Sequence, residues 1–162
     1  MPIPWLAIAL ICAPVSNAIG QSSDRDQPVV VTADRSEYSG ELQQQTLTGN
    51  VVIEQGSLRI NADKIVIGLV QGALDNIDAS GRPATFEQLD DEGRKIKGQA
   101  TRVQLSVASD RLQLLGNAVL STPTQSLSGD RVDYNLHTQA ASAVGGDEQV
   151  HIVIQPVKSE TQ

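Results

Sequence analysis

The sequence predicts an all-β protein built from two copies of one strand module. Short runs alternate apolar and polar residues, the period of a strand that is buried on one face. Val, Ile and Leu supply most of the apolar positions, and polar or Gly-containing segments separate the runs. The pattern around Gly49-Asn50 recurs without gaps around Gly116-Asn117, 67 residues later (116 − 49). Together these observations favour a sandwich, a jelly roll or a related β architecture.

Residues 1–18 form an apolar segment that predicts a secretory signal peptide. Its apolar run at 5–13 is too short for a transmembrane helix, which needs about 20 residues. Ser16 and Ala18 are small residues at the spacing expected for cleavage after Ala18. The alternative is an uncleaved anchor. The only cysteine, Cys12, lies within this segment, so the exported chain is expected to lack disulfides. The signal segment, rather than the cysteine content, predicts a periplasmic location.

Composition limits the core and the partners. A length of 162 residues suits one domain or two small repeats that share a core. Hydrophobic residues make up 40% of the chain but aromatic residues only 2%, so the interior must be aliphatic. The net charge of −7, without a basic run, argues against nucleic acid as a partner.

Residues 28–156 are predicted to form the folded domain. A polar leader at 19–27 precedes it and a tail at 157–162 follows it, and both are expected to be flexible. No window of the mature chain shows a sustained helical stripe. The strand candidates, in order, are residues 29–32, 47–54, 58–61, 65–69, 84–87, 96–107, 112–120, 132–136 and 150–154.

The repeated positions indicate a true internal duplication. Shared strand periodicity explains matched apolar residues, but it does not explain ungapped matches of Gly-Asn and Asp. Gly within an alternating run predicts a bulge, a bend or a close backbone approach. Duplicated modules stack and share a continuous core, and two copies leave an open strand edge at each end. The matches include Ala33/Ala100, Arg35/Arg102, Leu47/Leu114, Gly49/Gly116, Asn50/Asn117 and Asp63/Asp130.

No motif predicts catalysis, a metal site or a cofactor. His137 and His151 occur without the spacing of metal ligands, and structural or solvent-facing roles are expected for both. Asp63 and Asp130 occupy equivalent repeat positions, so turn formation between strands is the favoured role. A hydrolase that uses these two carboxylates is the enzymatic alternative.

The order of the motifs resembles a known family. The stretch "TADRSEYSGELQQQTLTGNVVIEQGSLRINADKIVI" has an Ala-Asp-Arg entry, a Gly-Asn-Val-x-Ile strand and an Ala-Asp-x-Ile strand. "KGQATRVQL", "LLGNAVL" and "LSGDRVDYNL" are similar to a second round, and "VHIVIQP" to a closing strand. This pattern, over residues 29–156, resembles the OstA-like repeat of the lipopolysaccharide-transport proteins. The periplasmic bridging member matches best, because LptC keeps a membrane anchor and LptD continues into a long β-barrel.

This resemblance implies both the fold and the function. The fold would be an OstA-like β-jelly roll of two antiparallel sheets, open along one side and built from two repeats of about 67 residues. The family implies a non-enzymatic carrier that holds lipopolysaccharide by its lipid A acyl chains. It would bridge the inner and outer membranes through head-to-tail self-association and contacts with LptC-like and LptD-like proteins. The alternative is a packed β-sandwich that serves as a structural or interaction module of the cell envelope and binds no lipid.

Strand alternation assigns candidate residues to these roles. The lipid-groove candidates assume that the chosen face of each strand points inward, since one slip in register would invert the set. They are Val51, Ile53, Ile65, Ile67, Phe86, Leu105, Leu112, Leu114, Leu120 and Tyr134. The terminal strands carry no charged residue to block strand addition. The predicted assembly edges are Val29, Val30, Val31 and Thr32 at one end, and Val150, His151, Ile152, Val153 and Ile154 at the other.

Overall fold

The computed structural model describes residues 21–156, so the signal peptide, cleavage at Ala18 and the tail at 157–162 lie outside the described residues. A short 3-10 helix, η1 (Gln21–Asp26), occupies most of the segment expected to be a flexible leader. The ten strands are β1 (Val30–Thr32), β2 (Arg35–Ser39), β3 (Gln44–Gln55), β4 (Leu58–Val70), β5 (Ala73–Leu89), β6 (Lys95–Ser106), β7 (Arg111–Ser121), β8 (Gln125–Asn135), β9 (Ala141–Val144) and β10 (His151–Ile154).

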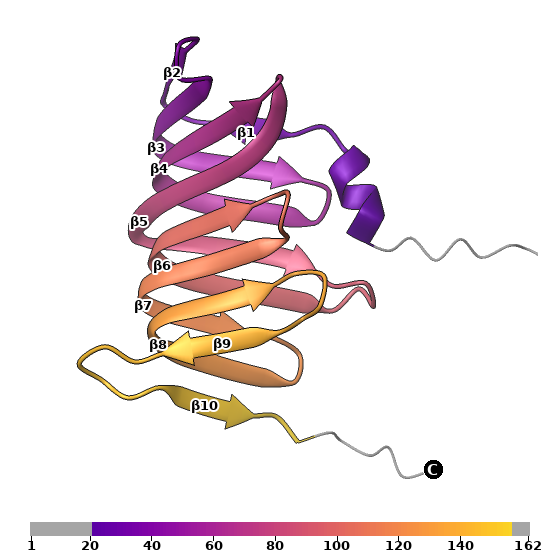
Figure 1. Ribbon diagram of the computed structural model, residues 1–162, viewed down its shortest axis with the longest axis vertical. Coiled ribbons are helices and arrows are strands. Elements are labelled where there is room, and N and C mark those ends of the chain that lie inside the picture. Colours follow the sequence, from indigo (N-terminus) through magenta and orange to yellow (C-terminus); the bar gives the residue numbers. More distant parts are fainter. Residues whose placement is uncertain (1–20, 157–162) are drawn as a thin grey trace, which may run out of the picture.

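All ten strands belong to one continuous antiparallel sheet (Figure 1). Its path runs β1-β3-β4-β5-β6-β7-β8-β10, with β2 also paired to β3 and β9 also paired to β8. From β2 to β9, each strand pairs with the next one in the sequence, as short antiparallel connections favour, whereas β1 pairs with β3 and β10 with β8. Within residues 21–156, no helix is long and apolar enough to cross a membrane.

A line of register shifts folds this sheet into two layers. Each long strand pair is interrupted near its middle, and the interruptions fall beside one another from strand to strand. We call this line the corner; it lies between Thr48 and Val51, Asn61 and Lys64, Ser80 and Ala84, Gln99 and Arg102, and Leu115 and Ala118. Bulges bend strands, so the aligned set turns the whole sheet. The first layer contains β1 and β10, and the second contains β2 and β9.

The Gly-Asn pairs of the two repeats lie at the corner. Gly49 and Asn50 have φ angles of 81° and 47°, and Gly116 and Asn117 have 77° and 49°. Gly and Asn are the residues that tolerate this left-handed region. The predicted bend is confirmed at both sites. The structure adds a close approach at Gly49, where Asn50 Nδ2 donates to Asp34 Oδ2 at 2.9 Å.

The duplication is also visible in the strand register. Val30 pairs with Glu54, and Lys97 pairs with Ser121, so each partner shifts by 67 positions. The same offset of 67 relates the pair Arg35–Thr48 to the pair Arg102–Leu115. The pair β1–β2 is therefore the first-repeat equivalent of the single strand β6.

The core fills the space between the layers and is almost entirely aliphatic. Phe86 is its one phenylalanine and is fully buried. The outer faces carry ion pairs instead: Arg131 Nε donates to Asp133 Oδ2 at 2.6 Å, and Arg102 Nε donates to Asp78 Oδ1 at 2.7 Å. The hydrogen bond from Arg131 holds the pKa of Asp133 well below its ordinary value. Apolar residues thus face inward and charged residues outward in both layers.

We predict that the corner glycines are required for stability. Gly49→Ala places a Cβ 2.9 Å from Cβ and Cγ of Asp34 at a φ of +81°. Gly72→Ala is the matched control, because its φ is +79° and nothing lies within 4 Å of the added Cβ. The control should lose about 1–2 kcal/mol of unfolding free energy through backbone strain alone. Gly49→Ala should lose roughly 1–2 kcal/mol more, through overlap and the lost Asp34 hydrogen bond. Urea unfolding measures both; equal losses would contradict this role of the corner.

Candidate functional site

The two layers meet at the corner and are separate along the opposite side of the molecule. Every long strand runs from one rim, across the corner, to the other rim. The turns at 55–58, 89–95 and 121–125 form the first rim, and those at 70–73, 106–111 and 135–141 form the second. The interior is therefore closed along the corner and reached along the side between the rims.

The ten groove candidates all lie in this interior. Val51, Ile53, Phe86 and Leu120 come from the first layer, and the other six come from the second. None of the ten is more than 5% exposed. Burial raises the pKa of Tyr134, which lies in the second layer. The groove candidates of the first layer therefore face those of the second layer across the interior. On every strand, the face predicted to point inward is the buried one.

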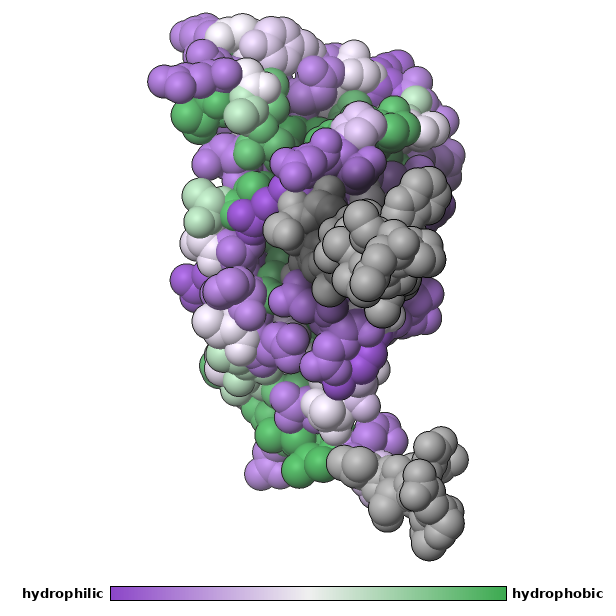
Figure 2. Space-filling model, turned by 90° about the vertical axis from the view of Figure 1, so that its right-hand side faces the viewer, coloured by the Kyte–Doolittle hydropathy of each residue, from purple (hydrophilic) through white to green (hydrophobic). Residues whose placement is uncertain are grey.

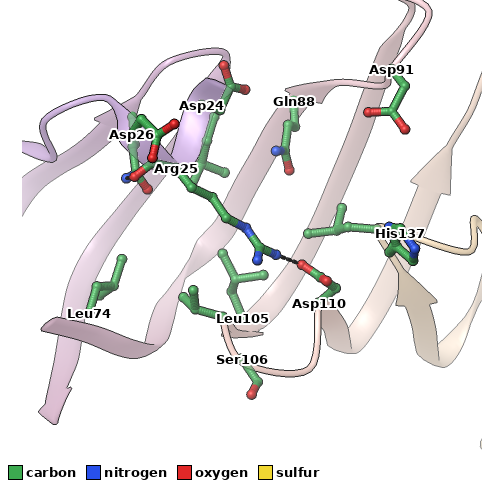
Figure 3. Close-up of a pocket in the computed structure, with 14 residues that line it drawn as sticks. Asp24, Arg25, Asp26, Leu74, Gln88, Asp91, Leu105, Ser106, Asp110 and His137 are labelled. Carbon is green, nitrogen blue, oxygen red and sulfur yellow. Dashed lines mark hydrogen bonds and ion pairs between the residues drawn. The ribbon is translucent and has the colours of Figure 1, made fainter. Parts of the chain in front are cut away.

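A cavity of about 560 Å³ lies at the open side beneath η1 (Figure 3). Both rims contribute: Gln55 and Gln88 lie on the first, and Ser106 and His137 on the second. Gln88 Oε1 is buried and lacks a hydrogen-bond partner among the described residues. The apolar part of the lining consists of Leu58, Leu74, Leu105, Val107 and Leu136.

Polar contacts join η1 to both rims. Gln55 Nε2 donates to the backbone oxygens of Arg25, at 3.1 Å, and of Gln27, at 3.0 Å. Ser57 Oγ donates to the carboxylate of Asp24. On the opposite rim, the Arg25 guanidinium forms an ion pair with Asp110, as Figure 3 shows. The short helix therefore spans the open side.

A second cavity of about 450 Å³ lies at the β1–β2 end of the interior. Its lining is mostly aliphatic and includes Val31, Leu47, Ile67 and Leu69. Leu74 lines this cavity as well as the one beneath η1. The open side and this end of the molecule are thereby connected by apolar surface.

Only two groove candidates line either of these cavities. They are Leu105 beneath η1 and Ile67 at the β1–β2 end. The cavity beneath η1 is also lined by Leu58, Leu74 and Leu136, which are not among the predicted groove residues. Leu58 and Ile60 alternate with Arg59 and Asn61, which indicates that Leu58 faces inward. The sequence has no signal, however, that places Leu58 near a rim, where the cavity lies.

Both ends of the sheet expose apolar strands. Within residues 21–156, β1 pairs only with β3, and β10 pairs only with β8. Val30 is 52% exposed and Ile154 is 75% exposed. Val29 and Val150 adjoin these strands without belonging to them. On the face shown in Figure 2, hydrophobic side chains gather at the lower end and just below the hydrophilic upper tip, with hydrophilic side chains over much of the surface between them.

The residues considered for chemistry do not form a site. Asp63 and Asp130 are exposed at the corner, and neither side chain forms a hydrogen bond or ion pair with another described residue. The Asx-type bond given as an example of their structural role is therefore not formed among residues 21–156, whereas both residues do lie at the equivalent register shifts of the two repeats. His137 and His151 are exposed. In residues 21–156, no group of three or more His, Cys, Asp or Glu side chains is placed to hold a metal ion.

Comparison with known proteins agrees with this architecture. Residues 30–140 match the family model described as "LptA/(LptD N-terminal domain) LPS transport protein". The lipopolysaccharide export system protein LptA of Escherichia coli (strain K12) is 36% identical over 85% of this chain and 75% of that protein. LptA of Haemophilus influenzae is 32% identical over 93% of this chain and 90% of that protein. These relatives are named as transport proteins, not as enzymes.

A solved structure shares the fold. The crystal structure of LptH, the LptA-homologous periplasmic component of the lipopolysaccharide transport device of Pseudomonas aeruginosa, superposes with a TM-score of 0.75. The match covers 83% of this chain and 99% of that chain at 24% identity, which bears on the fold alone. With its two-repeat jelly roll, its open side and these sequence matches, the chain belongs to the LptA/LptD N-terminal domain family of lipopolysaccharide-transport proteins.

Proposed function

We propose that this protein carries lipopolysaccharide across the periplasm with the acyl chains held between its two layers. One observation carries the proposal: the interior is aliphatic and closed along the corner, with a cavity of about 560 Å³ at its open side and one of about 450 Å³ at its β1–β2 end, and the two share Leu74. Acyl chains gain about 25 cal/mol per Å² of buried apolar area and need no specific polar partner. The predicted signal peptide at 1–18 would provide export.

The polar part of the ligand would remain at the rims. Lipopolysaccharide joins several acyl chains to one anionic saccharide, so its two parts need different surroundings. A groove open along its length lets the acyl chains lie inside while the saccharide stays in water. The relatives in Escherichia coli and Haemophilus influenzae are named as lipopolysaccharide export system proteins, which supports this arrangement.

The bridge itself would form by strand addition at the two ends. An exposed apolar edge without charge invites pairing with another strand. Joining β10 of one copy to the β1–β2 end of the next is a heterologous contact that does not close on itself, so it extends a filament. It would also continue the interior from copy to copy. LptC-like and LptD-like proteins would occupy the ends of the bridge in the same way.

The packed-module alternative is favoured by one observation. Eight of the ten groove candidates line neither the cavity at the open side nor the one at the β1–β2 end, and none of the ten exceeds 5% exposure. A protein of that kind would keep its layers together and bind envelope proteins without lipid. Under the carrier proposal, the layers must instead separate as acyl chains enter, which the open side allows without breaking the corner.

We predict that photo-crosslinkers at Ile53 and Leu120 capture lipopolysaccharide in cells. Both side chains are fully buried between the layers, so only a ligand that enters the interior reaches them. Arg59 is the control position, because it is exposed on the outer face of the neighbouring strand β4. Crosslinked adducts are measured by immunoblotting for lipopolysaccharide. Capture at Arg59 that equals or exceeds capture at the two interior positions would contradict the groove.

We predict that Ile152→Pro limits self-association. The N–H of Gln155 donates inward to the backbone oxygen of Thr124 at 2.9 Å. Because N–H groups alternate in direction along a strand, the N–H of Ile152 points away from β8. Proline therefore removes a free outward donor and spares the pairing of β10 with β8.

Ile152→Ala is the matched control, since it shortens the side chain and retains the N–H. Sedimentation across a concentration series should show concentration-dependent growth for the wild type, partial loss for Ile152→Ala and the largest loss for Ile152→Pro. A wild type that stays monomeric at every concentration, or a proline variant that assembles as well as the wild type, would contradict strand addition at this edge.

A further inference from the structure

The contacts of η1 differ in kind from those that hold the jelly roll together. Its sequence, QSSDRD, contains no apolar residue, so it has no apolar side chain to insert into the interior that it covers. A six-residue 3-10 helix also has little stability of its own, because its hydrogen bonds are poorly aligned and few. The helix is therefore held over the cavity by its polar contacts with Gln55, Ser57 and Asp110.

These contacts are unequal on the two rims. On the first rim the helix fits closely: a Cβ added to Gly56 would lie 2.9 Å from Cα of Asp24. The chain then continues through Gln27 and Pro28 into β1, which fixes this end to the sheet. Among the side chains of residues 24–156, the ion pair Arg25–Asp110 is the contact that joins the helix to the second rim. Its side chains are 55% and 26% exposed, and exposed ion pairs contribute little to stability.

From this asymmetry we propose that η1 is a displaceable strap, closed by the Arg25–Asp110 ion pair, that must leave the second rim before an acylated ligand enters the interior. The proposal rests on the carrier function proposed above. When the ion pair breaks, the strap turns about residues 27–28 and uncovers Leu105, Val107 and Leu136. Its weak closure is what permits loading, because a strongly bound helix would hold the interior shut.

The first test follows the opening of the strap without any lipid. Val107 lines the cavity beneath η1, and Val107→Cys keeps the side chain close to its original size. In the full chain with Cys12→Ser, this thiol is the only one, and its rate of reaction with a maleimide reports the opening. Asp110→Asn is the variant of choice: it removes the charge, and Asn tolerates the φ of 52° at this position.

Asp110→Asn and Arg25→Ala should each raise the labelling rate at Val107→Cys at least threefold. High salt should raise the rate for the unaltered strap but not for either variant, because salt screens an exposed ion pair. Arg59→Ala is the matched control, since it removes the arginine of another exposed ion pair, with Glu54, and should leave the rate unchanged. An exposed thiol at Ser121→Cys should react at one rate in all backgrounds. Equal rates at Val107→Cys in all variants would overturn the proposal.

The second test prevents the opening. Arg25→Cys and Asp110→Cys, in the Cys12→Ser chain, are joined by a short bis-maleimide linker that contains a disulfide, and binding of an acylated fluorophore is measured. The joined form should bind at least tenfold more slowly than the unjoined form and should recover when the linker is reduced. Undiminished binding in the joined form would overturn the strap. If the labelling test succeeds and neither form binds the fluorophore, the strap stands and the carrier function fails.

Discussion

The structure depends on the bend that every long strand makes at the corner. Two left-handed residues in succession are costly for most side chains, and the chain places Gly followed by Asn at both equivalent positions of the repeat. Without the aligned register shifts, the ten strands would form one flat sheet with an aliphatic face exposed to water. With them, the same sheet covers that face with its own second half.

This way of burying the core has a geometric consequence. A sheet folded along one line closes the interior on that line and leaves the opposite side without backbone hydrogen bonds between the layers. Among residues 21–156, the layers are therefore joined there by side-chain packing and by the polar contacts of η1. A second repeat lengthens the interior without changing its cross-section, which suits a ligand that moves along it. Folding the sheet along one line also leaves it with two end strands. Within residues 21–156, the edges at β1–β2 and at β10 are therefore open to pairing with another strand.

The sequence predicted the fold well because period-two alternation and an ungapped repeat both survive in the structure. The alternation placed all ten groove candidates on inner faces, and the Gly-Asn pairs identified the bends. The role of Asp34 at the first corner was not foreseen, since it lies 15 residues before Gly49 (49 − 34) and only the fold brings them together. The cavity beneath η1 was missed for a similar reason. A polar, non-periodic segment such as QSSDRD has no signal for helix or for position.

The central claim is that acyl chains occupy the space between the layers. The most direct measurement is competition for an acylated fluorophore bound to the purified protein, with intact lipopolysaccharide and its deacylated saccharide as competitors. If acyl chains are the part that binds, intact lipopolysaccharide displaces the fluorophore and the deacylated saccharide does not. Failure of lipopolysaccharide to compete, or equal competition by the saccharide alone, would contradict the account and favour a packed module.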